Sequence, residues 1–380
     1  MNTKIIRRIS IFTLLFLVVF SISVSAYDLS YIDEEVNTDE ILNTIPDELN
    51  EHLPNEILEE NDISKIAEKF SFEELINYIL SVIKKLIPSV FKNLSSLFIF
   101  IILCSLLNAS KNAFAGDMFA KTIEYISILG IAIITYGYLN EIIEKTDSYL
   151  NAMDTVINSL LPTMALLFTM GGNISTAVTS SYGMAFTITF INTVLQYVLV
   201  PVLNICFGLC IASRLSGFSG INEITKTVKK FITIILVAIV TLFSIYLMFK
   251  SNLSLATDGI TVRTIKFAGS FVPVIGGALG ETVRSVVSGL SVIKNSVGYV
   301  GIIIVLIITL PTLLYLTANK ISMDLMSAFS KMLGCTKEGE FLEEFSSLIN
   351  FSLAVTLCVG MLFVFELTIF ISISPALAGA

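Results

Sequence analysis

Charged residues and the residue types used in catalysis are scarce in this chain. Of its 380 residues only 14% are charged, whereas soluble chains average about a quarter. Tryptophan is absent, and histidine occurs once, as His52. General acid–base chemistry therefore has few candidates, and the sequence contains no phosphate-binding loop, nucleophile elbow or metal-binding helix motif. We expect no enzyme activity, no catalytic residue, no bound metal or cofactor and no nucleic-acid partner.

The five cysteines support neither a disulfide framework nor a zinc site. Cys335 lies in a polar segment, and the other four lie in apolar ones: Cys104, Cys206, Cys210 and Cys358. Cys206 and Cys210 lack the second pair of ligands that a structural zinc ion requires. We expect all five to be ordinary packing residues.

Long uncharged runs dominate what is present. Residues 155–213 contain no Asp, Glu, Lys or Arg, which is too long for one membrane crossing and too apolar for water. This run is interrupted by Pro162, Gly171, Gly172, Gly183 and Pro201. Interrupted backbone at membrane depth is tolerated only where protein or a cavity receives its polar groups, so the pattern favours a channel or a transporter.

The N-terminal part of the chain has the pattern of an exported segment. Residues 1–26 combine a basic start, an apolar core and a small-residue cleavage site, which predicts a signal peptide, with an uncleaved anchor as the alternative. Residues 27–83 carry 16 acidic and 2 basic residues. We expect residues 27–90 to form short helices outside the cytoplasm, either as a solvated acidic surface or as a docking segment for a basic partner.

Residues 91–380 are expected to form an all-α, multi-span membrane domain. Its six expected crossings are residues 93–110, 122–140, 183–213, 231–249, 295–319 and 345–367. The basic loops 111–121, 214–230 and 320–337 are predicted to be cytoplasmic, and the acidic loop 141–154 to lie outside with the N-terminal segment. The basic loop 250–266 disagrees with this topology, because it would also fall outside.

Two apolar pieces, 160–174 and 267–280, are too short or too interrupted for regular crossings and are expected to form re-entrant hairpins. They belong to a weak repeat, since prolines 162 and 273 are 111 residues apart and prolines 88, 201 and 311 are spaced by 113 and 110. The expected units, 121–230 and 231–343, each contain two crossings. The repeat is therefore parallel.

The second piece contains the most distinctive string, Phe271-Val-Pro-Val-Ile-Gly-Gly-Ala-Leu279. With the expected signal peptide, acidic segment and multi-span remainder, it resembles the stage III sporulation protein AE family of endospore-forming bacteria along the whole chain. The resemblance implies a mother-cell membrane protein around the forespore, within the multi-protein A–Q channel complex. The implied partners are other stage III A-operon proteins and, indirectly, stage II sporulation protein Q. No catalytic residues are implied.

Two sets of residues are candidates for a functional site. The hairpin set comprises Pro162, Gly171, Gly172, Pro273, Gly276, Gly277, Gly280, Glu281 and Arg284, which either form or gate a path or serve as packing surfaces, with Glu281 and Arg284 as a salt bridge. The intramembrane polar set comprises Asn192, Gln196, Asn204 and Glu366. The first three line a pore or bond a neighbouring helix, and Glu366 is either a functional carboxylate or one that reaches the interface at the end of its span.

These patterns predict a membrane component of a secretion-like sporulation channel that forms or gates part of a transmembrane path. The alternative is a non-conducting scaffold that recruits and stabilises other members of the complex. A homo-oligomer is compatible with either function. A transporter driven by a coupling ion would require more buried carboxylates than this sequence offers.

Overall fold

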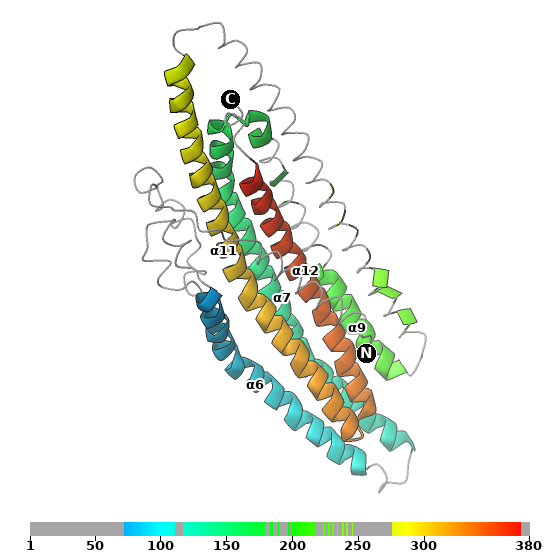
Figure 1. Cartoon of the computed structure of the whole chain (residues 1–380). Coiled ribbons are helices and arrows are strands. Elements are labelled where there is room, and N and C mark those ends of the chain that lie inside the picture. The colour runs from blue at the N-terminus through cyan, green and yellow to red at the C-terminus, as the bar shows by residue number, and fades with distance from the viewer. Residues whose placement is uncertain are drawn as a thin grey trace. The chain divides into compact units, whose positions relative to one another are not determined.

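A computed structural model of the chain describes residues 72–110, 117–178, 200–216 and 276–373, with scattered positions between 183 and 245. The main elements within these ranges are the helices α6 (Phe72–Ser110), α7 (Asp117–Met170), α9 (Val200–Ser216), α11 (Gly276–Met332) and α12 (Thr336–Ser372) (Figure 1). No strand occurs among the described residues. The expected all-α class is thereby confirmed for this part of the chain.

Four of these helices are long and apolar enough to cross a membrane: Leu75–Ala109, Lys121–Met170, Ser288–Met332 and Thr336–Ser372. The longest two helices, α7 and α11, are longer than the thickness of a bilayer. At about 1.5 Å per residue, the 54 residues of α7 extend over about 80 Å, against about 30 Å for the hydrocarbon core. The expected signal peptide, two of the six crossings and most of the acidic segment lie largely outside the described residues, and the repeat stays a prediction.

Two of the expected loops are wrong, because the chain there is helical. Residues 141–154 form the middle of α7, and Lys320 and Lys331 lie within α11. Charge alone indicates loops at these positions, but a helix with one charged face has the same composition. Only residues 333–335 form a turn between α11 and α12.

The expected interruption at Pro162 is also wrong, since α7 continues through it to Met170. The chain turns instead at Gly171 and Gly172, where Gly172 has φ 81°, a conformation that favours glycine. The second expected hairpin is partly corrected in the same way. Its residues from Gly276 onward are the regular start of α11, and residues 267–275 lie outside the described part of the chain.

The interior proline of α11 shows how such a helix stays continuous. Pro311 has no N–H to donate to the carbonyl of Ile307, four residues earlier. The hydroxyl of Tyr78, from α6, donates to this carbonyl oxygen at 3.0 Å and is buried with it. A neighbouring helix thus supplies the missing donor, as is usual for prolines in membrane helices.

Helices α11 and α12 form an antiparallel hairpin whose close approach depends on small residues. A Cβ atom added at Gly298 would lie 2.3 Å from Cγ1 of Ile371, and one added at Gly339 would lie 2.8 Å from the backbone oxygen of Ser327. A Cβ at Gly301 would touch Leu367 and Leu160. Small residues let backbones approach closely where lipid offers no hydrophobic drive for association.

The turn of this hairpin is hydrogen-bonded within itself and to α6. Gly334 has φ 83°, and the Ser330 hydroxyl donates to the carbonyl oxygen of Cys335 at 2.9 Å. From α6, the side-chain amide of Asn108 donates to Sγ of Cys335 at 3.1 Å, and the Ser105 hydroxyl donates to the carbonyl oxygen of Leu333 at 3.1 Å. The C-terminal end of α6 is therefore fixed at the turn.

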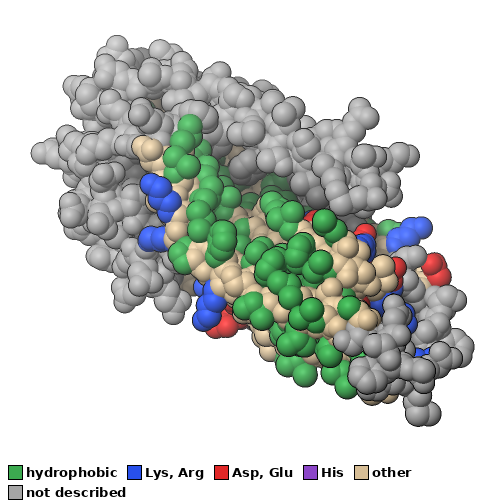
Figure 2. All heavy atoms as spheres, turned by 90° about the horizontal axis from the view of Figure 1, so that it is seen from below, with side chains coloured by type: hydrophobic (Ala, Val, Ile, Leu, Met, Phe, Trp, Pro, Cys, Tyr) green, Lys and Arg blue, Asp and Glu red, His purple; other side chains and the backbone are tan. Residues whose placement is uncertain are grey.

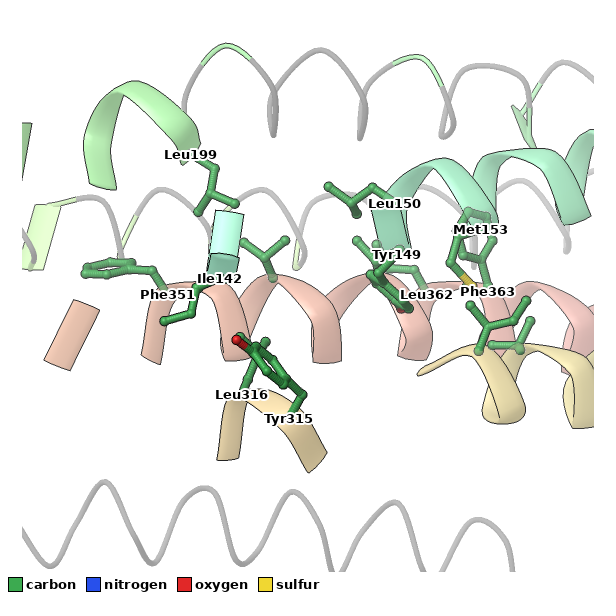
Figure 3. Close-up of a cluster of buried hydrophobic side chains, with 14 of the residues drawn as sticks. Ile142, Tyr149, Leu150, Met153, Leu199, Tyr315, Leu316, Phe351, Leu362 and Phe363 are labelled. Atoms are coloured by element: carbon green, nitrogen blue, oxygen red, sulfur yellow. The ribbon is translucent and has the colours of Figure 1, made fainter. Parts of the chain in front are cut away.

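The core lies where α7, α11 and α12 meet. In Figure 3, Tyr149 of α7 lies beside Leu362 of α12, and Met153 of α7 lies beside Phe363 of α12. The outer surface is apolar as well: on α6, Ile99 and Leu106 are each 66% exposed. Figure 2 shows hydrophobic side chains over much of the described surface seen from below, with charged side chains toward its margins. Such a surface suits a bilayer or a protein partner.

Candidate functional site

Tyr149 of α7 connects the three core helices through a buried hydrogen-bond group. Its hydroxyl donates to the carbonyl oxygen of Thr356 in α12 at 3.0 Å and lies 3.3 Å from Oγ1 of Thr309 in α11. A Cβ added at Gly360 would lie 3.2 Å from the same hydroxyl oxygen, so no larger residue fits there without displacement. This group fixes the relative depth of α7, α11 and α12.

A buried lysine lies near one end of the α11–α12 hairpin. Lys294 of α11 is only 4% exposed, and its ammonium donates to the carbonyl oxygen of Ile373, just after α12 ends. The same Nζ lies 5.7 Å from the ring centroid of Phe370. A cation is favoured at a helix C-terminus, where the last carbonyls lack intrahelical donors. The interaction therefore stabilises Lys294 inside apolar surroundings.

The end of α7 meets this lysine region. Phe168 and Phe370 form an edge-to-face ring pair with centroids 5.0 Å apart. Directly after Phe168 comes the Gly171–Gly172 turn, followed by Asn173, which is 2% exposed. The structure thus brings two of the predicted hairpin glycines near the C-terminal part of α12, which also carries Glu366.

Glu366 is one of the predicted polar residues that the structure places inside the bundle. It is 5% exposed, and α12 continues past it to Ser372. The uncharged run of α12 ends at Phe365, so a functional carboxylate and one that reaches the interface at the end of its span both stay predictions. A buried ionisable group within a membrane-length helix is a candidate functional residue by default.

Asn204 does not join this interior group. It lies exposed on α9, and its amide donates to the carbonyl oxygen of Val200 in its own helix at 3.0 Å. Bonding of this kind serves the helix itself, and the two predicted roles of Asn204, lining a pore or bonding a neighbouring helix, stay predictions. Asn192 and Gln196 lie outside the described residues.

The remaining hairpin candidates are only partly placed. Pro162 is exposed on α7, and Pro273 lies outside the described part of the chain. The other five lie on the helical backbone at the start of α11: Gly276, Gly277, Gly280, Glu281 and Arg284. Because residues 267–275 lie outside the described part of the chain, the meeting of the two hairpins stays a prediction, as does a salt bridge between Glu281 and Arg284.

Charged side chains near the α11–α12 turn form ion pairs between helices. Arg214 of α9 bonds both Glu340 and Glu344 of α12, and the Arg214 and Glu344 side chains are only 12% and 15% exposed. From the other side, Lys337 pairs with Glu124 of α7 at 2.8 Å. Pairing offsets the cost of burying these charges, so the group joins α7, α9 and α12 rather than presenting a reactive site.

Sequence reasoning missed Lys294 and Tyr149. In the sequence, Lys294 marks only the boundary of an expected crossing. A lysine beside an apolar run can nevertheless bury its aliphatic stem while its ammonium bonds a nearby carbonyl. No local pattern marks Tyr149, whose partners are 160 and 207 residues away. In the described ranges, no group of three His, Cys, Asp or Glu residues could hold a metal ion.

Long apolar helices with buried ionisable groups define a multi-span membrane protein. Comparison with known proteins identifies its family. Residues 55–374 match the family of stage III sporulation protein AE, so the chain belongs to that family. Stage III sporulation protein AE of Bacillus subtilis (strain 168) is 24% identical over 283 residues, which cover 74% of this chain and 71% of that protein. No solved structure matches. The chain is thus a membrane protein of sporulation.

Proposed function

We propose that the protein is a membrane component of a secretion-like sporulation channel between mother cell and forespore, where it forms or gates part of the transmembrane path. Its place in this proposal is the mother-cell membrane around the forespore, in contact with other stage III A-operon proteins and indirectly with stage II sporulation protein Q. Six crossings, arranged as two parallel repeats, complete the proposed architecture. Membership of the family supports the sporulation role.

One observation carries the channel role: Lys294 and Glu366 are buried in membrane-length helices. An ionisable side chain in the bilayer costs several kcal/mol by most scales (about 2.5–3.5 kcal/mol on the insertion scale), and such residues are typical of ion and substrate pathways. Energy for transport would come from a partner or a gradient, because the sequence has no nucleotide-binding motif.

A non-conducting scaffold is the second candidate, and the α11–α12 packing favours it. The glycines along this interface leave no room for even one added carbon at Gly298 or Gly339 without a shift of the neighbouring atoms. An interface of this kind suits a rigid support that holds other subunits.

Flux measured on the purified full-length protein in liposomes separates the two functions. The channel role predicts passage of small ions or solutes through the wild-type protein and its loss in the Glu366→Gln variant. Gly289→Ala is the matched control, because no atom lies within 4 Å of the added Cβ. The absence of flux, combined with dispersal of the partner proteins when the gene is deleted, would contradict the channel and support the scaffold.

A second comparison tests the predicted hairpin. If Gly276 and Gly277 are packing residues, their replacement by Leu abolishes complex assembly while Glu281→Gln has a milder effect. The reverse order would contradict packing and support a role for the Glu281 carboxylate in the path.

A further inference from the structure

The outward face of the middle of α7 is polar over four helical turns. Its members recur at intervals of seven residues, which places them on one side of the helix. We call this set the α7 polar stripe: Glu144, Asp147, Ser148, Asn151, Asp154, Thr155 and Asn158. Five of them are exposed, and the two aspartates are half-buried.

The depth of this stripe is set by Tyr149, which lies within the same turns but faces the core. Its partners Thr309 and Thr356 lie near the middle of two uncharged runs, residues 295–319 of α11 and 345–365 of α12. The first run covers about 37 Å at 1.5 Å per residue, enough to cross a bilayer of about 30 Å. The stripe therefore lies beside the middle of these two uncharged runs, and we take that level as the centre of the bilayer.

The alignment of the helices does not depend on Tyr149 alone. Farther along the same helices, a Cβ at Gly301 of α11 would touch both Leu160 of α7 and Leu367 of α12. Phe168 and Phe370 are in ring contact beyond that level. Three levels of contact thus hold α7 beside the uncharged runs, with the α7 polar stripe on its outward face.

Lipid is an unsuitable neighbour for this stripe. Asp147 and Asp154 each accept a hydrogen bond from the asparagine four residues later, at 3.3 and 3.1 Å, and neither forms an ion pair with another described residue. Two carboxylates with so little compensation would cost about 2.5–3.5 kcal/mol each at the centre of a bilayer.

Pro162 removes one backbone donor beside the stripe. Pro162 has no N–H for the carbonyl of Asn158, a stripe member, and no described side chain donates to this oxygen. The matching carbonyl at Pro311 receives the Tyr78 hydroxyl instead. A carbonyl freed by proline needs water or a protein donor at membrane depth. Water at the same face would supply such a donor.

We propose that the α7 polar stripe lines a water-filled path at bilayer depth, completed on its other side by another protein surface. The proposal rests on the channel function and places one wall of the path on the outer face of α7. Three carboxylates in the stripe, Glu144, Asp147 and Asp154, against the single lysine of residues 141–154 give this wall a negative charge, which favours cations.

Thiol labelling in native membranes tests this placement. The full-length protein, with Ser148→Cys or Thr155→Cys, is produced in sporulating cells, and the membranes are treated with a charged, membrane-impermeant maleimide. Cys358 of the unaltered protein is the internal control, because it is partly exposed on α12 only two residues after Thr356. A lipid-permeant maleimide verifies that each introduced thiol can react.

We expect the impermeant reagent to label both stripe cysteines about tenfold faster than Cys358, since the reactive thiolate forms in water. Labelling by the permeant reagent alone would show lipid at the stripe and overturn the proposal. Failure of both reagents would show that protein covers the stripe and would also overturn it. Equal labelling of Cys358 and the stripe would show that this depth lies outside the bilayer, which likewise overturns the proposal.

The labelling result is separable from the channel function. If the stripe is labelled selectively but the reconstituted protein shows no flux, the channel function is contradicted, whereas the inference that water contacts this face of α7 still holds. If the protein shows flux but the stripe is not labelled, the proposed location of the path is contradicted, whereas the channel function still holds.

Discussion

Helices α7 and α11 are similar in length, each contains one interior proline, and both pack against α12 in the core. They differ on their outer faces. At the depth of Tyr149 and Thr309, α11 lies within an uncharged run, whereas the outer face of α7 presents three carboxylates and several amides and hydroxyls. Core packing alone therefore does not determine what a membrane helix presents outward. The difference indicates two environments at one depth, one apolar and one polar.

The tight approach of α11 to α12 provides the largest expected difference between the two helices. Gly298→Leu in α11 should prevent correct packing or destabilise it by about 3 kcal/mol or more, because the added atoms overlap Ile371. Gly137→Leu in α7 is the matched control, since no atom lies within 4 Å of its Cβ. Thermal unfolding of the detergent-solubilised protein measures both. Similar midpoints for the two variants would contradict the close contact.

The shared hydrogen-bond group of Tyr149 gives the next largest effect. Tyr149→Phe removes the bond to the Thr356 carbonyl and the contact with Thr309, and should reduce the free energy of unfolding by about 1–2 kcal/mol. Tyr125→Phe, at a position 44% exposed on the same helix, should have almost no effect. If both substitutions cost the same, Tyr149 does not fix the depth of α7 against the other helices.

The two interior prolines predict a smaller, coupled effect. Tyr78→Phe should cost about 1 kcal/mol in the wild-type protein, because it leaves the Ile307 carbonyl without its donor. In a Pro311→Ala background the new N–H bonds that carbonyl, so the same substitution should cost much less. A double-mutant cycle from denaturation curves gives the coupling energy.

Pro162→Ala in α7 is the control for that cycle. Its effect should be additive with Tyr78→Phe, because Tyr78 donates to the carbonyl beside Pro311 and not to the one beside Pro162. Coupling of Tyr78 to both prolines would show that it acts by general packing.

The smallest effect on folding is expected at the α7 polar stripe. Replacing Asp147 and Asp154 by Asn should change the free energy of unfolding by less than about 0.5 kcal/mol per site, since both side chains face away from the core. The same double variant should lower the ratio of cation to anion flux in liposomes. If the double variant conducts with an unchanged ratio of cation to anion flux, the α7 polar stripe does not line the path.

The sequence predicted well those features that depend on a single helix. Uncharged runs located α6, α11 and α12, and small residues marked places of close approach. Prediction failed at Pro162, because a proline in a long membrane helix is tolerated when its surroundings supply a donor to the freed carbonyl. It failed at residues 141–154, because a helix with one charged face has the composition of a loop. The seven-residue spacing from Glu144 to Asn158 was present in the sequence and would have indicated a helix.

The candidate site could be predicted less completely than the fold. Glu366 was found from its position between apolar residues, but its burial depends on the packing of α7 and α11 around α12. Lys294 and Tyr149 become distinctive only when their partners are placed, since Ile373 and Thr356 are distant in the sequence. Depth relative to a neighbouring helix is a tertiary property that local patterns do not contain.

The short turn at residues 333–335 also has a consequence for the order of assembly. α11 and α12 are adjacent in the chain, so their contacts close a small loop and need little search. By contrast, the bond from Tyr78 to Ile307 joins residues 229 positions apart, and Tyr78 is synthesised long before its partner exists. During biosynthesis Tyr78 therefore has no Ile307 carbonyl to bond until α11 is made, and premature termination before α11 would leave α6 with its contacts to α7 alone.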